Sequence, residues 1–285
     1  AESTLSVEAK EEIAEHWGLN DPPLERFASW GKNVLKGDFG TSITYKQQVS
    51  TVILERFKYS IVLMLVAWCF SGIVGFLIGV LAGIYKGGLF DKIIKIFCLA
   101  LQSAPTFWIG LLILSLFSVY LGWFPIGFAV PMGKLSLKIT IWDRIYHLIL
   151  PALTLSILGI SRVTLFTRQK LIEILNSDFI LFAKARGENT RQLVIRHGLR
   201  NIALPAITEQ FASFSELFGG IALAETVFSY PGLGTATTAA GLNGDVPLLL
   251  GIAIFSAIFV FVGNFIANIL YGVLDPRLKE GKYNG

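Results

Sequence analysis

Residues 59–85 read YSIVLMLVAWCFSGIVGFLIGVLAGIY, a run of 27 residues without a charged side chain. A helix needs about 20 mainly apolar residues to cross a hydrocarbon core roughly 30 Å thick, so this run is long enough for one span. Its glycines Gly75, Gly79 and Gly83 recur every four residues and share one helical face, where another helix can approach closely. We therefore expect a transmembrane helix over about 60–85, with this glycine face turned toward protein.

The whole chain of 285 residues has the composition of a membrane protein. Hydrophobic residues make up 53% of it and charged residues 15%, and the mean hydropathy is +0.63. A soluble domain carries about 25% charged residues, so this chain has too few charges to cover a water-facing surface. Its two cysteines, Cys69 and Cys98, lie in apolar stretches and cannot form a disulfide framework. The composition predicts an all-α polytopic membrane protein.

Other apolar stretches predict further spans. Three more uncharged runs have 38, 17 and 29 residues and cover residues 96–133, 145–161 and 246–274. Another stretch, 202–228, is apolar apart from Glu209, Glu216 and Glu225, and we count it as a span. None of the runs alternates in polarity as β-barrel strands do. Five spans are therefore expected, at about 60–85, 94–121, 147–169, 202–227 and 248–273.

The distribution of Lys and Arg predicts the orientation. One side of the membrane collects 14 of them, and the short loops of the other side, 122–146 and 229–247, hold three. Long segments count weakly in the positive-inside rule, so residues 1–58 are set aside. We expect the loop 162–200 and the C-terminus in the cytoplasm and residues 1–58 outside. Because residues 1–58 resemble no signal peptide, we also expect a transmembrane helix ahead of them.

A cytoplasmic loop between the third and fourth expected spans carries the strongest motif. Residues 177–201 read SDFILFAKARGENTRQLVIRHGLRN. Apolar Phe179, Phe182 and Ala183 fit one helical face, and Gly187 suits a helix C-cap or a hairpin turn. We expect a basic, partly apolar helix–turn–helix under the membrane, suited to docking on another protein.

This loop resembles the EAA loop of ABC importer permeases, specifically those of the dipeptide/oligopeptide/nickel transport family. Its pieces "A-x-A-x-G" and "RHxLRN…P" match Ala183, Ala185, Gly187 and residues 196–205. Leu181 stands where the general pattern has Glu, which is common in this subfamily. Five more motifs of the family occur along the chain in the family's order. They are GDxG at 37–40, PxFW at 105–108, ExxFxxPGLG at 225–234, DxP at 245–247 and LDPR at 274–277. Each motif is weak alone, but the ordered set over essentially the whole chain is specific.

The resemblance implies the architecture of a type I ABC importer transmembrane domain. Members of the first-permease type have six spans, of which five are visible here. The implied parts are an extracytoplasmic segment 1–58, a permease domain 59–276 with an EAA-type coupling loop 170–201, and a cytoplasmic tail 277–285. Such a subunit would lie in a bacterial or archaeal cytoplasmic membrane and import solutes by alternating access. Peptides, nickel and metal chelates are the solutes that the resemblance implies, and the residues do not choose among them.

The resemblance also implies partners. They are a second homologous permease forming a heterodimer, two ABC ATPases, an extracytoplasmic solute-binding protein and the lipid bilayer, with no nucleic acid. This chain has no ATP-binding signature, since Gly127 to Lys134 misses the P-loop spacing and lacks its hydroxyl residue. We expect no enzyme activity and no cofactor in the chain, with ATP and Mg bound by partner subunits. His16, His147 and His197 are far apart and form no metal constellation.

The candidate site residues form three groups. The ATPase-coupling group consists of Ala183, Ala185, Arg186, Gly187, Glu188 and Arg191. A gate or structural group, taken from the ExxFxxPGLG match, consists of Glu225, Pro231, Gly232 and Gly234. A translocation-path group consists of Glu209 and Glu216, which are seven residues apart and would share one face of a continuous helix.

The pair Glu209 and Glu216 leaves two interpretations open. A charged residue at mid-membrane costs at least ~2.5–3.5 kcal/mol, so each carboxyl needs a function or a partner. The pair could line the path and meet a cationic group of the solute, or contact the second permease or a neighbouring Ser or Asn. Two alternative functions also remain, a proton-coupled secondary transporter with Glu209 and Glu216 as its relay and a non-transport structural membrane subunit.

Overall fold

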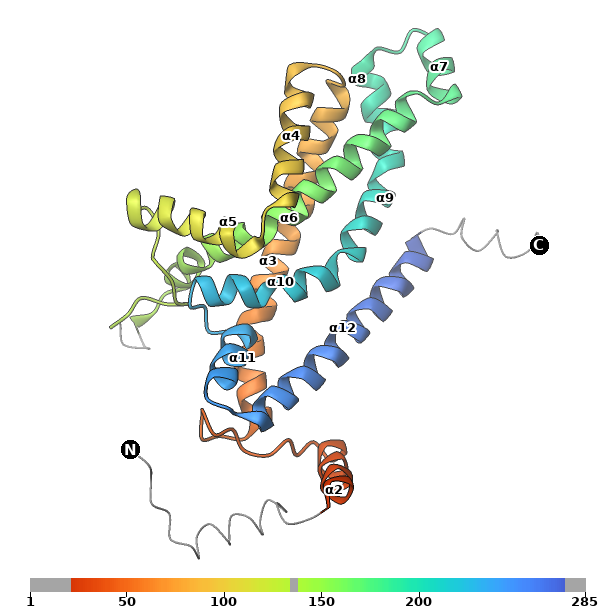
Figure 1. Ribbon diagram of the computed structural model, residues 1–285. Helices are drawn as coiled ribbons and strands as arrows, with labels where there is room; N and C mark the ends of the chain where they lie inside the picture. Colours follow the sequence, from red (N-terminus) through yellow and green to blue (C-terminus); the bar gives the residue numbers. More distant parts are fainter. Residues whose placement is uncertain (1–21, 134–137, 275–285) are drawn as a thin grey trace, which may run out of the picture.

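The structure, a computed structural model, describes residues 22–133 and 138–274 (Figure 1). Within these residues the chain is helical, and its one isolated β-bridge joins Thr41 and Gln48. The all-α prediction is therefore confirmed. Most of the terminal LDPR match, the tail 277–285 and His16 lie outside the described residues.

The longest helix is α3, Val49–Ile84, which has 36 residues and contains the run 59–85 up to Ile84. It begins about ten residues before the expected span because Val49, Val52 and Ile53 are buried against the C-terminal helices α11, Leu233–Leu242, and α12, Val246–Leu274. The last ten residues of the segment 1–58 thus form the first turns of this helix.

Helix α6, Ile141–Leu175, packs along α3 through the glycine face. It begins with a capping box in which Thr140 and Asp143 bond each other's backbone N–H groups. A Cβ atom at Gly75 would lie 2.8 Å from Val163 Cβ, and one at Gly79 would lie 2.7 Å from the carbonyl oxygen of Thr164. The Thr164 hydroxyl donates to the carbonyl of Gly75 at 3.2 Å. The expected orientation of the glycine face toward protein is confirmed.

The stretch expected as a span at 94–121 is bent in the structure. Helix α4, Leu89–Ser103, and helix α5, Thr106–Ile113, meet at a break, and α5 continues as a π-helical segment, Leu114–Tyr120. The two parts are bent by 110°. Pro105 explains the break, because a residue before proline avoids the helical region and Ala104 has ψ 137°.

The expected span 202–227 is also broken. It consists of α9, Leu199–Ala212, and α10, Phe214–Val227, which run in different directions in Figure 1. Ser213 between them has ψ −4°, far from the helical value of about −42°. Within residues 22–133 and 138–274, three helices are long and apolar enough to cross a membrane, or four if α4 and α5 count as one bent span.

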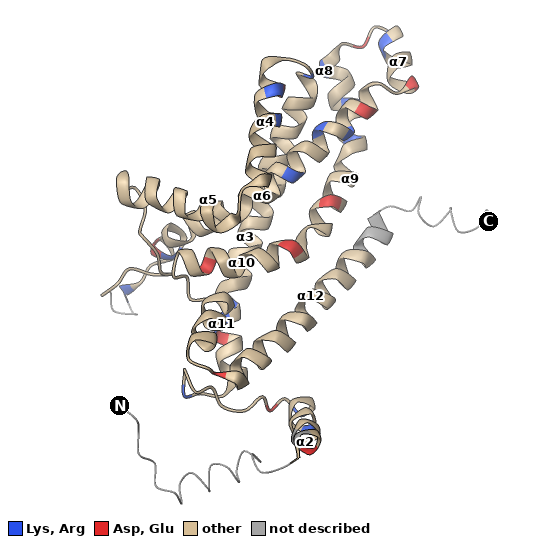
Figure 2. Ribbon diagram, viewed as in Figure 1, with Lys and Arg blue, Asp and Glu red and all other residues tan. Residues whose placement is uncertain are grey.

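The remaining helices lie at the two ends of the long ones. Helix α2, Pro23–Leu35, lies near the start of α3, and the far end carries α7, Asp178–Ala185, α8, Thr190–Gln192, and the π-helical turn Leu193–Gly198 that leads into α9 (Figure 1). Figure 2 shows Lys and Arg gathered at the end formed by α4, α7 and α8, whereas the described part of α12 is free of charge.

Gly79→Ala should destabilise the protein, because the added methyl group meets the backbone of α6. Overpacking of this kind costs about 1–3 kcal/mol. A matched control is Gly241→Ala in α11, where nothing lies within 4 Å of the new Cβ. Thermal unfolding of the detergent-purified variants should place Gly79→Ala well below wild type and Gly241→Ala at or above it. Equal melting temperatures for the two variants would show that the glycine face is not a packing requirement.

Candidate functional site

Helices α7 and α8 and the π-helical turn after them form a hairpin, residues 177–198, which turns tightly at Gly187. Gly187 has φ +89°, a left-handed conformation that side chains disfavour. Its N–H donates to Lys184 O at 3.0 Å, and the N–H of Glu188 donates to Ala183 O at 3.3 Å. These two bonds form a Schellman motif, which satisfies the last carbonyls of α7. The expectation that Gly187 ends a helix and turns the chain is confirmed.

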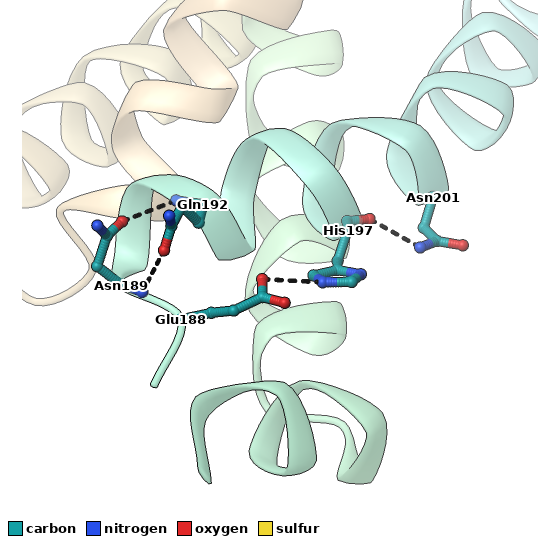
Figure 3. A network of polar contacts seen from close by, with 5 residues as sticks. All are labelled: Glu188, Asn189, Gln192, His197 and Asn201. Atoms are coloured by element: carbon teal, nitrogen blue, oxygen red, sulfur yellow. Dashed lines mark hydrogen bonds and ion pairs between the residues drawn. The ribbon is translucent and has the colours of Figure 1, made fainter. Parts of the chain in front are cut away.

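A network of polar contacts fixes the second arm of the hairpin (Figure 3). Asn189 and Gln192 form a reciprocal capping box with bonds of 2.9 and 3.0 Å. Glu188 Oε2 lies 3.1 Å from His197 Nε2, and Asn201 Nδ2 donates to His197 O at 2.7 Å. The turn and the following helix are therefore held together by side chains on both sides of the cap.

The hairpin has a buried face and an exposed apolar face. Ile180, Ala183 and Leu193 are buried against the end of α6. Ala183 therefore lies on the opposite face from Phe179 and Phe182, which the sequence placed beside it. Phe179, Leu181 and Phe182 are 49%, 57% and 70% exposed. The other candidate residues Ala185, Arg186 and Arg191 are exposed, and Glu188 is half-buried. The hairpin thus presents apolar side chains with cations nearby.

The ExxFxxPGLG match folds into a closed cluster around Glu225. This carboxylate is fully buried and accepts hydrogen bonds from Ser60 Oγ at 2.5 Å and from the N–H of Gly234 at 2.6 Å. A Cβ at Gly232 would overlap the carboxylate itself, and one at Gly234 would overlap Ala222. The two glycines thus leave the space that lets Glu225 cap the start of α11, while Pro231 lies half-buried beside them.

Glu209 and Glu216 do not share a helical face, because the break at Ser213 separates them. Glu209 is half-buried on α9 and has no ion pair among the described residues. Glu216 on α10 forms a two-pronged ion pair with Arg162 of α6, in which Arg162 Nη2 lies 2.5 Å from Glu216 Oε1. The expected common face was wrong because it assumed a continuous helix.

Arg162 is a residue that the sequence reasoning did not assign. With Glu216 it borders an open recess between α6, α10 and the start of α5. The other residues that line the recess are Thr106, Leu155, Leu158, Gly159, Ser213, Leu217 and Gly220. The available signal was an arginine inside the apolar stretch expected as the third span, but its partner lies 54 positions away.

Asp245 is a second residue that the sequence did not assign to any of the three candidate groups, although it belongs to the DxP match. It is buried before α12 and accepts from Ser42 Oγ at 2.6 Å, from the N–H of Thr44 at 2.9 Å and from the N–H of Leu248 at 3.2 Å. It therefore both caps α12 and clamps the turn 41–48. Burial raises the pKa of Asp245, but the hydrogen bonds from Ser42, Thr44 and Leu248 outweigh burial and hold it below the ordinary value.

Comparison with known families agrees with this architecture. Residues 75–280 match the family model described as "Binding-protein-dependent transport system inner membrane component". The chain belongs to this family. The match covers the described helices from the last ten residues of α3 to α12, including the hairpin and the segment 225–234.

Curated relatives in the family are similar over nearly the whole chain. The oligopeptide transport system permease protein AppB of Bacillus subtilis (strain 168) is 36% identical over 96% of this chain and 86% of its own length. The di/tripeptide transport system permease protein DppB of Pseudomonas aeruginosa (strain UCBPP-PA14) is 32% identical over 92% and 83%. The dipeptide transport system permease protein DppB of Escherichia coli (strain K12) is 30% identical over 99% and 88%.

A solved structure confirms the fold. The chain superposes on a structure titled "Inward facing conformations of the MetNI methionine ABC transporter: CY5 native crystal form" with a TM-score of 0.59 and 17% identity. The superposition covers 79% of this chain and 96% of that one. The expected type I importer fold is therefore confirmed for this family member.

Gly232→Ala should destabilise this family member, because the new Cβ overlaps the buried carboxylate of Glu225. We expect a loss of about 2 kcal/mol or more, measured as a lower melting temperature and a smaller folded fraction in detergent. Gly219→Ala in α10, with nothing within 4 Å of its Cβ, is the control.

A double variant tests whether the clash is with Glu225. In a Glu225→Ala background the same Gly232→Ala change should cost clearly less, because the overlapping carboxylate has gone. Fully additive losses would contradict the arrangement of the cluster.

Asp245 predicts a pH-dependent contribution to stability. Its folded pKa lies below the ordinary value, so its stabilisation is present above an unfolded pKa of about 4 and is lost as pH falls through the folded value. Asp245→Asn should therefore lower the melting temperature at pH 7, and the difference from wild type should shrink at the acid end. Glu55→Gln, at an exposed carboxylate of α3, should show no such trend. A difference for Asp245→Asn that is constant with pH would refute the charge effect.

Proposed function

We propose that this chain is the transmembrane permease subunit of an ATP-driven importer of peptides. The family match and the printed names of the relatives from Bacillus, Pseudomonas and Escherichia support the solute class. The single observation that supports coupling to ATP is the shape of the hairpin. Its side chains Phe179, Leu181 and Phe182 are exposed, and hydrogen bonds fix the turn that follows them. An apolar surface of this kind needs a protein partner, and a cytoplasmic ATPase has the location and the energy source.

Coupling follows from how the hairpin is attached. Its buried residues Ile180, Ala183 and Leu193 rest on the end of α6, and its second arm continues into α9 without a loop. A push from the ATPases on the hairpin would move α6 and α9 together. In this mechanism Ala183 and Gly187 set the shape of the hairpin, and Ala185, Arg186, Glu188 and Arg191 surround the apolar contact. The two arginines would pair with acidic side chains of the ATPase, while Glu188 holds His197 within the hairpin. ATP and Mg would stay on the ATPase subunits.

The other partners take the remaining surfaces. A second homologous permease would complete a heterodimer and cover the path that includes Glu209 and Glu216. A solute-binding protein would dock outside, on the surface around α2 and the turn 41–48 that Asp245 holds. The orientation that goes with this docking has residues 1–58 outside and the hairpin and the C-terminus in the cytoplasm of a bacterial or archaeal cell. The cluster of Glu225, Pro231, Gly232 and Gly234 would serve as a fixed structural element near the gate.

The ion pair between Glu216 and Arg162 argues against the proton-coupled alternative. A relay through Glu209 and Glu216 needs carboxyls that exchange protons with each other, but the two lie on different helices and Glu216 is held by a guanidinium. The exposed apolar hairpin has no role in a non-transport structural subunit. An ABC permease accounts for both features.

Phe182→Ser should reduce ATP-driven uptake while leaving the subunit folded, because the side chain is 70% exposed and makes no contribution to the core. In proteoliposomes containing the assembled importer, uptake of a labelled dipeptide and the ATPase activity stimulated by binding protein should both fall several-fold. Gly187→Val should act in the same direction by straining the turn at φ +89°.

Leu89→Ser is the control, since Leu89 is 76% exposed at the start of α4 and lies outside the hairpin. It should leave uptake near wild type. If Phe182→Ser and Leu89→Ser behave alike, with normal uptake in both, the hairpin is not the coupling surface.

A further inference from the structure

We propose that Arg162 and Glu216 form a binding site for the two charged ends of a zwitterionic solute. The guanidinium would take the α-carboxylate of an amino acid or short peptide, and the Glu216 carboxylate would take its α-ammonium. This inference rests on the proposed transport function and names the chemistry that the path recognises.

The pair lies in stretches that the sequence predicts as spans, since Arg162 falls within 147–169 and Glu216 within 202–227. Charged side chains inside a membrane are expensive in hydrocarbon and face a bundle interior or a water-filled space. Yet Arg162 and Glu216 are 39% and 57% exposed in this chain alone. In a heterodimer these exposed side chains would face the gap toward the second permease.

The surroundings make the pair a recess rather than a flat surface contact. Leucines Leu155, Leu158 and Leu217 form apolar walls, and Gly220 adds no side chain to the recess. Apolar walls exclude water and strengthen the electrostatic attraction of a charged ligand group. Small residues and apolar walls around a few polar groups are the usual composition of a small-molecule site.

A second guanidinium–carboxylate pair, which also has its arginine on α6, provides a comparison with a purely structural ion pair. Arg168 of α6 and Asp91 of α4 have side chains that are 14% and 3% exposed. The N–H of Gly87 also donates to Asp91 at 2.8 Å, so the carboxylate is fully enclosed by this chain. The pair of Arg162 and Glu216 lacks such enclosure, and both of its side chains can reach a ligand.

The two opposite charges of the pair suit a zwitterionic ligand better than a simple cation or anion. A guanidinium presents a planar fork that binds carboxylates with two hydrogen bonds, and a carboxylate accepts readily from an ammonium. When a zwitterion binds, the ion pair between Arg162 and Glu216 is replaced by two ion pairs with the ligand. A simple cation or anion would instead leave one of these two side chains without a partner. The site therefore differs from the cation-binding acidic pair that Glu209 and Glu216 would form on a shared face.

Cysteine protection tests the site directly. The probe is Thr106→Cys, which lines the recess, in a Cys69→Ala and Cys98→Ala background. The assembled importer is labelled with a maleimide in the absence of nucleotide and of solute-binding protein, so the selectivity of that protein does not enter. The ligands are alanyl-alanine, its N-acetyl form and its C-terminal amide, each titrated to half-protection.

Alanyl-alanine should protect at an about tenfold lower concentration than either capped form, since each cap removes one charge-assisted contact. Glu216→Gln should raise the half-protection concentration of alanyl-alanine to that of the N-acetyl form and leave the N-acetyl form unchanged. Arg162→Gln should remove the preference over the amide in the same way. Glu173→Gln is the matched control, because Glu173 forms an exposed pair with Lys170 outside the recess.

Equal protection by all three ligands in the parent protein would overturn the proposal, as would an equal loss for all three in Glu216→Gln. Should Arg162→Gln fail to assemble, the ligand series in the parent protein and in Glu216→Gln still decides. ATP-driven uptake by the parent protein is measured alongside. Normal uptake without discrimination among ligands would reject this site alone, whereas absent uptake would reject the transport function.

Discussion

The close approach of α3 and α6 is the constraint on which the rest of the structure depends. Lipid provides no hydrophobic drive between helices, so association relies on packing at short range. Gly75 and Gly79 bring the backbones of these two long helices together, and the Thr164 hydroxyl bonds across the contact. Along the same pair of helices, Arg168 holds Asp91 at the start of α4. The tail of α6 then supports the hairpin.

Next to this pair of long helices, the segments α4–α5 and α9–α10 are broken. Backbone that leaves the helix within a membrane is tolerated only where protein or water can satisfy it. The break at Ser213 meets this condition, because Ser213 Oγ bonds Gln210 O at 2.8 Å. Trp68 of α3 donates to Gln210 O at 2.9 Å, and Gln210 Nε2 returns a bond to Trp68 O. The end of α9 is thus fastened to α3, and α10 leaves in a new direction.

The local sequence pattern was sufficient to predict those features that a few neighbouring residues determine. The glycine face of α3, the turn at Gly187 and the presence of long apolar helices all follow from spacing and residue type. Pro105 offered a signal for the bend in α4 and α5, but an apolar run without charges outweighed it. Ser213 carries no comparable signal, since serine is common inside helices, and the face shared by Glu209 and Glu216 failed for that reason.

Contacts between distant positions could not be read from spacing. Arg162 meets Glu216 across 54 positions and Ser42 meets Asp245 across 203, and each contact exists only because intervening helices pack as they do. A displacement of the hairpin would reach α10 by two routes, through α9 and the break at Ser213, and through α6, which contacts α10 directly. The bonds between Trp68 and Gln210 tie the end of α9 to α3 just before that break. Arg162 of α6 and Glu216 of α10 join the two routes, so the proposed coupling would change the geometry of this ion pair.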